Sequence, residues 1–199
     1  MDLEVLAIPE KFGFDPVDYQ YFHQLFQNRT IIFNQEVAEN LIETVYLPLK
    51  DFEEDDIQKS VTLILNSPGG SVSDGFFLAH YLKGYKKQLN IIVTGYAASM
   101  AAVILAGAGQ NKNITRYCYP SSYALIHDGF VAISPSESKT AEDIMAFNHK
   151  VDKDIRQFIL ENTQITAEQY DAQARHQWFL SSKEMLELGM IDKIIGCDS

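Results

Sequence analysis

The pattern of apolar and polar positions changes period several times along this chain, and each change marks a different kind of element. Apolar runs rich in β-branched residues at 30–33, 60–66 and 90–95 predict buried strands. Apolar positions three and four apart in the intervening segments predict amphipathic helices. Strands that alternate with helices are typical of crossover βαβ units, so the sequence predicts an α/β fold with a largely parallel sheet.

The remaining elements follow from the same periods and from capping signals. The first helix is expected to begin at Pro16, with Asp15 as its N-cap. The acidic segment 51–56 is expected to be a solvated loop. The other predicted elements are helices over 36–49, 74–85, 99–106, 166–174 and 182–189, and strands over 116–120, 123–127 and 190–195.

One predicted helix is longer than the others and covers 140–162. Its apolar stripe is formed by Ile144, Phe147, Val151, Ile155, Phe158 and Ile159. At a rise of 1.5 Å per residue this helix would be roughly 33 Å long, and we expect it to project beyond the sheet. An apolar stripe on a projecting helix needs a partner, and a second copy of the chain is the simplest one. The alternative is that the helix lies along its own domain.

Length and composition then limit the function. The chain has 199 residues, 46% of them hydrophobic, which suits a single domain over 1–199. A formal net charge of −11 argues against nucleic acids and anionic membranes as partners. No run of 18 apolar residues predicts a membrane helix, and residues 1–14 have neither a clear period nor the features of a signal peptide. We expect a cytoplasmic protein with a mobile segment at 1–14.

The few residues that could bind a metal or a cofactor show no suitable spacing. The two cysteines, Cys118 and Cys197, fit no disulfide framework and are expected to be reduced thiols. The histidines do not form a His-Glu-x-x-His motif, and the glycines at 69–70 are not followed by the Lys-Ser/Thr of a phosphate-binding loop. The sequence therefore predicts neither a metal nor a cofactor.

Three weak signals for chemistry lie at predicted junctions between elements. Ser99, in the stretch GYAASMAA, begins an apolar helix after a strand, where unpaired backbone N–H groups favour developing negative charge. The turn NSPGG around Gly70 can expose N–H groups to a ligand. His127 ends a short apolar strand, at the edge of a parallel sheet where sites assemble. Each residue alone is better explained as a cap, a tight turn or a packing residue; the set in this order is stronger.

In four segments the sequence resembles the Clp protease proteolytic subunit family. These segments are LNSPGGSV, GYAASMAAVILAGA, YALIHDG and FLSSKEMLELGMIDKI, in the family's order, and the resemblance extends from about Tyr21 to Ile195. It implies the ClpP/crotonase-like fold of repeated ββα units, in which 140–162 is a projecting handle helix. It also implies a serine endopeptidase built from two stacked heptameric rings, a tetradecamer fed with polypeptides by an AAA+ unfoldase.

The resemblance also implies a role for particular residues. Ser99 would be the nucleophile, and His127 the general base and later the acid. The N–H groups of Gly70 and Met100 would bind the oxyanion. The substrate would add as an extended strand beside Ser71, Val72 and Phe130.

Two departures from the family pattern stand out. The family's third catalytic residue is an aspartate, but Gln177 occupies its place here, and an amide cannot neutralise the imidazolium formed in the transition state. Gln177 could orient His127 in a slow enzyme, Asp171 or Asp128 could substitute for it, or the site could form only on assembly. Thr62 and Ile64 also stand where the family usually has aromatic residues that bind the unfoldase.

Three function classes follow from these residues. The first is the serine endopeptidase, and the second is a weakly active or inactive ring subunit with a structural or regulatory role. The third, a crotonase-like acyl-CoA enzyme, would share the fold and the backbone oxyanion donors but normally uses carboxylates rather than a Ser–His pair.

Overall fold

A mostly parallel sheet runs through the residues that the structure, a computed structural model, describes: 16–55, 57–128, 138–174 and 176–197. Its main path has the order β1-β2-β3-β4-β7, and all these neighbours are parallel. The strands are β1 (Thr30–Phe33), β2 (Val61–Ser67), β3 (Leu89–Ala98), β4 (Ile114–Cys118), β5 (Tyr123–Ile126), β6 (Trp178–Ser181) and β7 (Lys193–Ile194). β5 pairs in parallel with the end of β3, and β6 pairs antiparallel with β5.

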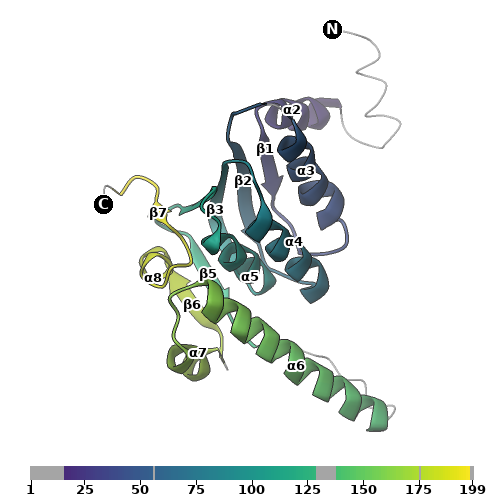
Figure 1. Cartoon of the computed structure of the whole chain (residues 1–199), viewed down its shortest axis with the longest axis vertical. Helices are drawn as coiled ribbons and strands as arrows, with labels where there is room; N and C mark the ends of the chain where they lie inside the picture. The colour runs from purple at the N-terminus through teal and green to yellow at the C-terminus, as the bar shows by residue number, and fades with distance from the viewer. Residues whose placement is uncertain (1–15, 56, 129–137, 175, 198–199) are drawn as a thin grey trace.

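Helices connect the strands and cover the sheet, as Figure 1 shows. They are α2 (Pro16–Gln27), the π-helical turn η1 (Ile42–Tyr46), α3 (Leu47–Glu54), α4 (Val72–Gly84), α5 (Met100–Gly107), the 3₁₀ turn η2 (Ala108–Gln110), α6 (Ser138–Asn162), α7 (Ala167–Gln173) and α8 (Ser182–Glu187). The alternation of strands and helices confirms the predicted α/β fold with a parallel sheet.

The hydrophobic core lies between the sheet and helices α4 and α5. β2 alternates buried and half-buried positions along its whole length, as a strand with one face on the core should. Every residue of α5 is buried, because this helix is packed between α4, the sheet and α6. An apolar helix enclosed in this way holds its N-terminal residue in a fixed place, and that residue directly follows Ser99.

Two predictions for the segment before β2 need correction. A helix is expected over 36–49, and η1 and α3 confirm its second part, but it begins only at Ile42 because Val37 pairs as an isolated bridge with Gly70. The segment 51–56 was expected to be a solvated loop, but α3 continues through it to Glu54. Phe52 on this helix is buried, and the Glu53 carboxylate accepts hydrogen bonds from the Tyr81 hydroxyl and the Lys86 amide. The acidic residues therefore cap and anchor neighbouring elements.

Two strands also differ from the predictions. β3 continues three residues beyond the predicted end at Gly95, because its last part pairs with β5 instead of β4. β6 was not predicted, because it has only four residues and shows no clean alternation of buried and exposed positions. Its antiparallel pairing with β5 brings the segment around Gln177 beside the segment around His127.

The long helix is confirmed as α6, and it projects from the body in Figure 1. Its C-terminal half is core, since Ile155, Phe158 and Ile159 are at most 7% exposed. Its projecting half carries Ile144, Met145 and Phe147, which are 38%, 49% and 64% exposed. One apolar stripe therefore serves two purposes: half of it packs on the protein's own helices, and the other half is open to a partner.

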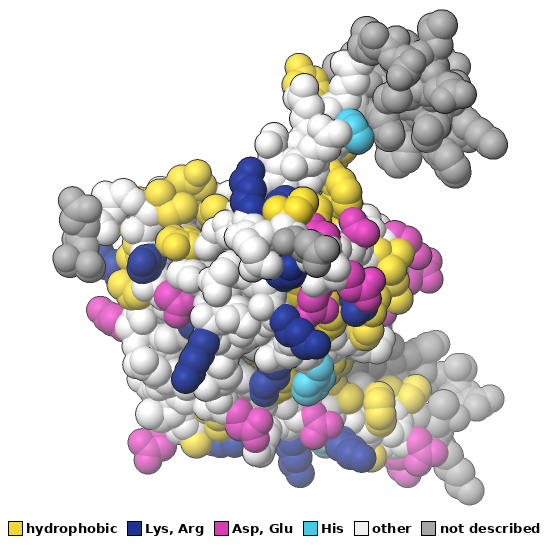
Figure 2. Space-filling model, turned by 45° about the horizontal axis from the view of Figure 1, so that its top comes forward, with side chains coloured by type: hydrophobic (Ala, Val, Ile, Leu, Met, Phe, Trp, Pro, Cys, Tyr) yellow, Lys and Arg dark blue, Asp and Glu magenta, His cyan; other side chains and the backbone are white. Residues whose placement is uncertain are grey.

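Charged side chains are spread over the surface. On the face seen in Figure 2, Lys and Arg lie singly among Asp and Glu, without a continuous basic patch. Within the described residues, the structure has no helix that is both long and apolar enough to span a membrane. The predicted mobile segment 1–14 lies outside the described residues.

Candidate active site

Ser99 occupies the sharp junction between β3 and α5. Its backbone has φ 54° and ψ −123°, a conformation that residues other than glycine rarely adopt. The Ser99 amide donates to the Leu125 carbonyl at 2.8 Å, and the Ser99 carbonyl accepts from the Ala102 amide at 2.9 Å. These bonds hold the junction, and a strained turn of this kind presents a hydroxyl at the start of a helix.

The glycine turn after β2 packs directly against this junction. Gly69 has φ +89°, and a Cβ placed there would lie 2.5 Å from the Ala98 carbonyl oxygen and 2.7 Å from the Met100 nitrogen. Gly70 has φ +143°, and a Cβ there would lie 2.3 Å from the Val37 carbonyl oxygen. Both positions therefore require glycine for conformation and for space.

We expect Gly69→Ala to destabilise the protein by about 2–4 kcal/mol, because it combines an unfavourable φ with a backbone clash. Gly84→Ala is the matched control, since a Cβ at this helix end meets no atom within 4 Å and should be neutral or slightly stabilising. Urea unfolding of both variants measures the difference. Equal stability of the two variants would contradict the close packing of the turn on the serine junction.

Two backbone amides at the junction are available to a ligand. Val37 uses the Gly69 carbonyl and the Ser71 amide in its bridge, which leaves the Gly70 N–H on the opposite side of the chain. Met100 is the first residue of α5, so its N–H has no partner within the helix. Among the described residues, neither amide donates a hydrogen bond, and this is the state that the predicted oxyanion site requires.

His127 directly follows β5. Its Nδ1 is 2.6 Å from the Asp128 carbonyl oxygen, and a carbonyl can only accept, so Nδ1 carries the proton in this contact. The neutral ring then has an unprotonated Nε2, which is the tautomer that a general base needs. The Asp128 amide donates to the Ala174 carbonyl at 2.8 Å and ties this loop to the end of α7.

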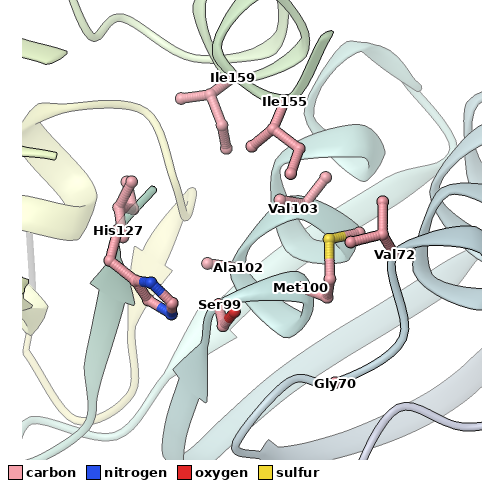
Figure 3. Close-up of a pocket in the computed structure, with 10 residues that line it drawn as sticks. Gly70, Val72, Ser99, Met100, Ala102, Val103, His127, Ile155 and Ile159 are labelled. Atoms are coloured by element: carbon pink, nitrogen blue, oxygen red, sulfur yellow. The ribbon is translucent and has the colours of Figure 1, made fainter. Parts of the chain in front are cut away.

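A pocket of about 210 Å³ brings the predicted residues together (Figure 3). Its polar end is formed by Ser99, His127 and Gly70, with Met100 beside them. Its walls are apolar and consist of Val72, Ala102, Val103, Ile126, Ile155 and Ile159. Within the described residues no hydrogen bond joins Ser99 to His127; such bonds often tighten only when substrate is bound.

The pairing of β5 with β6 places Gln177 opposite His127. The β5–β6 register pairs Ile126 with Trp178, and its continuation by one residue places Gln177 opposite His127. Gln177 is exposed, and within the described part of the chain no hydrogen bond joins it to His127. In this structure the orienting contact on Nδ1 comes from a backbone carbonyl.

The two carboxylates considered as substitutes for Gln177 have other contacts. Asp171 forms a two-point ion pair with Arg156 on α6, at 2.6 and 2.8 Å. Asp128 contacts the ring through its carbonyl oxygen. Neither carboxylate is recorded in a hydrogen bond with the imidazole within the described residues.

The remaining predicted residues are placed as follows. The Ser71 hydroxyl caps α4 by accepting a hydrogen bond from the Asp74 amide. The Ser71 amide donates a hydrogen bond to the Val37 carbonyl. Val72 lines the pocket, and as the first residue of α4 its N–H is not used within the helix. Phe130 lies outside the described residues.

Other reactive groups do not form a second site. Both cysteines are free, and burial raises the pKa of the Cys118 thiol to about 11, so this thiol is a poor nucleophile at neutral pH. Among the described residues no group of three His, Cys, Asp or Glu side chains could hold a metal ion.

Sequence reasoning missed two parts of the site. Ile155 and Ile159 on α6 form a wall of the pocket, although from the sequence this helix was expected only to project or to lie along its own domain. Their apolar stripe was the available signal, but it does not tell what each half contacts. The positive φ of Ser99 was also missed, because serine has no sequence signature for that conformation.

Comparison with known proteins shows the family of the chain. The pattern that defines the Clp protease family matches residues 15–198.

The chain belongs to the Clp protease family.

Two relatives in the Clp protease family cover most of its length. The chain is 30% identical over 196 residues to the ATP-dependent Clp protease proteolytic subunit 1 of Shouchella clausii (strain KSM-K16), covering 98% of this chain and 99% of that protein. It is 29% identical over 178 residues to the ATP-dependent Clp protease proteolytic subunit of Streptococcus gordonii (strain Challis), covering 89% of each. The family resemblance predicted from the four segments is therefore confirmed.

Proposed function

We propose that this chain is the serine endopeptidase subunit of a ring-shaped, compartmental Clp-type protease. The observation that carries the proposal is the pocket in which Ser99 and His127 meet the backbone amides of Gly70 and Met100. Within the described residues these two amides donate no hydrogen bond. Membership of the Clp protease family supports it, and so do relatives that are named proteolytic subunits. A single domain over 1–199 would carry this activity.

The proposed reaction is acyl transfer through Ser99. The Ser99 Oγ attacks the peptide carbonyl while His127 Nε2 takes its proton, and the resulting oxyanion accepts hydrogen bonds from the Gly70 and Met100 amides. His127 then protonates the leaving amine, and an ester of Ser99 remains. Water, deprotonated by the same Nε2, hydrolyses that ester. The apolar walls of the pocket favour an apolar substrate side chain, and the chain of the substrate would pair beside Val72, with Ser71 and Phe130 close by.

The proposed assembly rests on α6 and on the exposed apolar residues. The apolar projecting half of α6 would join two heptameric rings into a tetradecamer. An AAA+ Clp ATPase would deliver unfolded polypeptides in the cytoplasm, since both relatives are named as subunits of ATP-dependent proteases. The outer face of the sheet, where Thr62 and Ile64 replace the family's usual aromatic residues, would then need other contacts, and the exposed Ile32, which pairs with Ile64, is one that it offers.

A second candidate function is a ring subunit with weak activity or none, whose role is structural or regulatory. Gln177 in place of the family's aspartate favours it, because an amide cannot neutralise the imidazolium that His127 would become in the transition state. The crotonase-like alternative has no comparable support in the pocket.

One experiment separates these two functions. The assembled protein is treated with a serine-directed fluorophosphonate, and native mass spectrometry measures the size of the assembly in the same sample. We expect covalent labelling of Ser99 in a ring-sized particle, since labelling reports an activated hydroxyl. A ring-sized particle in which Ser99 stays unlabelled would overturn the peptidase and favour the passive subunit. Labelling of a single-chain species would overturn the proposed assembly.

A further inference from the structure

We propose that Asn66 is a positioning residue for Ser99, acting through an irregularity in β3 that Gly95 makes possible. This inference rests on the proposed peptidase function and names a residue outside the pocket that the reaction would need. Three observations carry it: the register of β3, the hydrogen bonds of the Asn66 side chain, and the space at Gly95.

The register of β3 changes just before the active serine. Leu65 of β2 pairs with Val93, but Ser67 pairs with Ala97, so one β2 residue opposes three residues of β3. At this bulge β3 stops pairing with β4, whose last partner is Val93, and starts pairing with β5 at Tyr96. A bulge of this kind re-aims the strand that carries it.

The β3–β5 ladder sets the position of Ser99 relative to His127. Ala98 pairs with Leu125, and the Ser99 amide donates to the Leu125 carbonyl. Ser99 therefore lies one residue, and His127 two residues, beyond the last pair of this short ladder. A slip of one residue in the ladder would turn every side chain to the opposite face.

The Asn66 side chain holds the first residue of that ladder. Asn66 is the β2 residue opposite the bulge, and its Oδ1 accepts a hydrogen bond from the Tyr96 amide at 3.0 Å. Its Nδ2 donates to Asn34 Oδ1 at 2.6 Å, which fixes the amide group from the other side. The Asn66 oxygen therefore satisfies an N–H that the irregular β2–β3 ladder leaves without a backbone partner.

Gly95 leaves the space for this contact. A Cβ on Gly95 would lie 2.5 Å from Asn66 Oδ1, and the only other atoms near it also belong to the Asn66 side-chain amide, at 3.4 and 3.9 Å. Within the described residues no other group outside the two chain neighbours lies closer than 3.9 Å, so a methyl group at position 95 would act mainly by moving the Asn66 amide. The two residues form one device, and their substitutions should not be additive.

The test measures kcat and KM of peptide cleavage, and the rate of fluorophosphonate labelling, on assemblies whose size is confirmed by native mass spectrometry. We expect Asn66→Ala and Gly95→Ala each to lower kcat and the labelling rate by about 10–100-fold, with KM changed by less than about 3-fold, because the nucleophile is displaced by a fraction of its contact distance. The kcat of the double variant should lie within about 3-fold of the kcat of each single variant.

Two further variants serve as controls. Asn66→Asp keeps an oxygen for the Tyr96 amide, and Asn34 can turn its own amide to donate to the new carboxylate, so kcat should stay within about 3-fold of wild type. Asn34→Ala removes only the outer hydrogen bond and should lower kcat by less than about 5-fold. If Asn66→Ala does not fold, Gly95→Ala and Asn66→Asp still separate positioning from stability.

The outcomes distinguish this inference from the function on which it rests. If the wild-type protein is labelled, and Asn66→Ala and Gly95→Ala are labelled at the wild-type rate, the positioning role alone is overturned. Additive losses in the double variant also overturn it, since the two residues would then act separately. An assembled wild type that neither labels nor cleaves overturns the proposed peptidase, and the positioning role with it.

Discussion

Gln177→Asp is expected to raise kcat for a fluorogenic peptide by up to about 10⁴-fold, the factor by which an amide in place of the aspartate slows a serine protease. At 1.36 kcal/mol per factor of ten, this corresponds to about 5 kcal/mol of transition-state stabilisation. The physical reason is charge: in the proposed reaction His127 would become an imidazolium in the transition state, and the Asp128 carbonyl on Nδ1 is a dipole that cannot neutralise it. Steady-state kinetics on assembled protein measures the change.

Two matched variants separate charge from side-chain length at this position. Gln177→Asn has the length of aspartate without its charge, so it should leave kcat within about 3-fold of wild type. Gln177→Glu has the charge on the longer side chain and should give an intermediate gain. An unchanged rate in Gln177→Asp would show that residue 177 does not reach His127, although the β5–β6 register places it opposite.

Ser99→Ala is expected to abolish covalent labelling and to reduce peptide cleavage to the level that the backbone amides alone provide. Loss of the nucleophile from a complete triad costs about 10⁶-fold in kcat, whereas loss of the aspartate alone costs about 10⁴-fold. A protein that already lacks the carboxylate should therefore lose only about 10²-fold when Ser99 is replaced. The same replacement in a Gln177→Asp background should cost about 10⁶-fold.

This difference between the two backgrounds is the sharp part of the prediction. It follows because residues that act as one unit are strongly non-additive. Cys118→Ser is a suitable control, since this buried thiol has no part in the proposed chemistry and should leave cleavage unchanged within about 3-fold. Cleavage that persists unchanged in Ser99→Ala would exclude Ser99 as the nucleophile.

The parts of the fold with strong local signals could be predicted from the sequence. β2 and α5 were predicted because β-branched alternation and a wholly apolar helix leave little choice. The start of the helix over 36–49 was wrong because a distant contact, the bridge of Val37 to Gly70, takes the first residues out of helical conformation. β6 was missed for a similar reason: four residues gain their strand conformation from β5 and not from their own pattern.

The candidate site shows the same division. Ser99, Gly70 and His127 lie at or shortly after the ends of elements that the sequence indicates, and the family resemblance predicted them as a set; the structure brings the three into one pocket. The bulge in β3 could not be predicted, since it depends on Asn66 reaching Tyr96 across the sheet. The conformation of Ser99 was also beyond the sequence, because Gly69, which packs against the junction, comes from the turn after another strand.

Helix α6 links two ends of the molecule that would otherwise be independent. Ile155 and Ile159 line the pocket of Ser99 and His127, and Phe147 is exposed about two turns further out on the same helix. Because both ends belong to one continuous helix, a tilt at the outer end would also move the inner end. In the proposed assembly, docking of the outer end of α6 would therefore also fix the position of the pocket wall at its inner end. Peptidase activity would then arise only when the ring encloses the pocket, and a single chain outside a ring would not cleave other proteins.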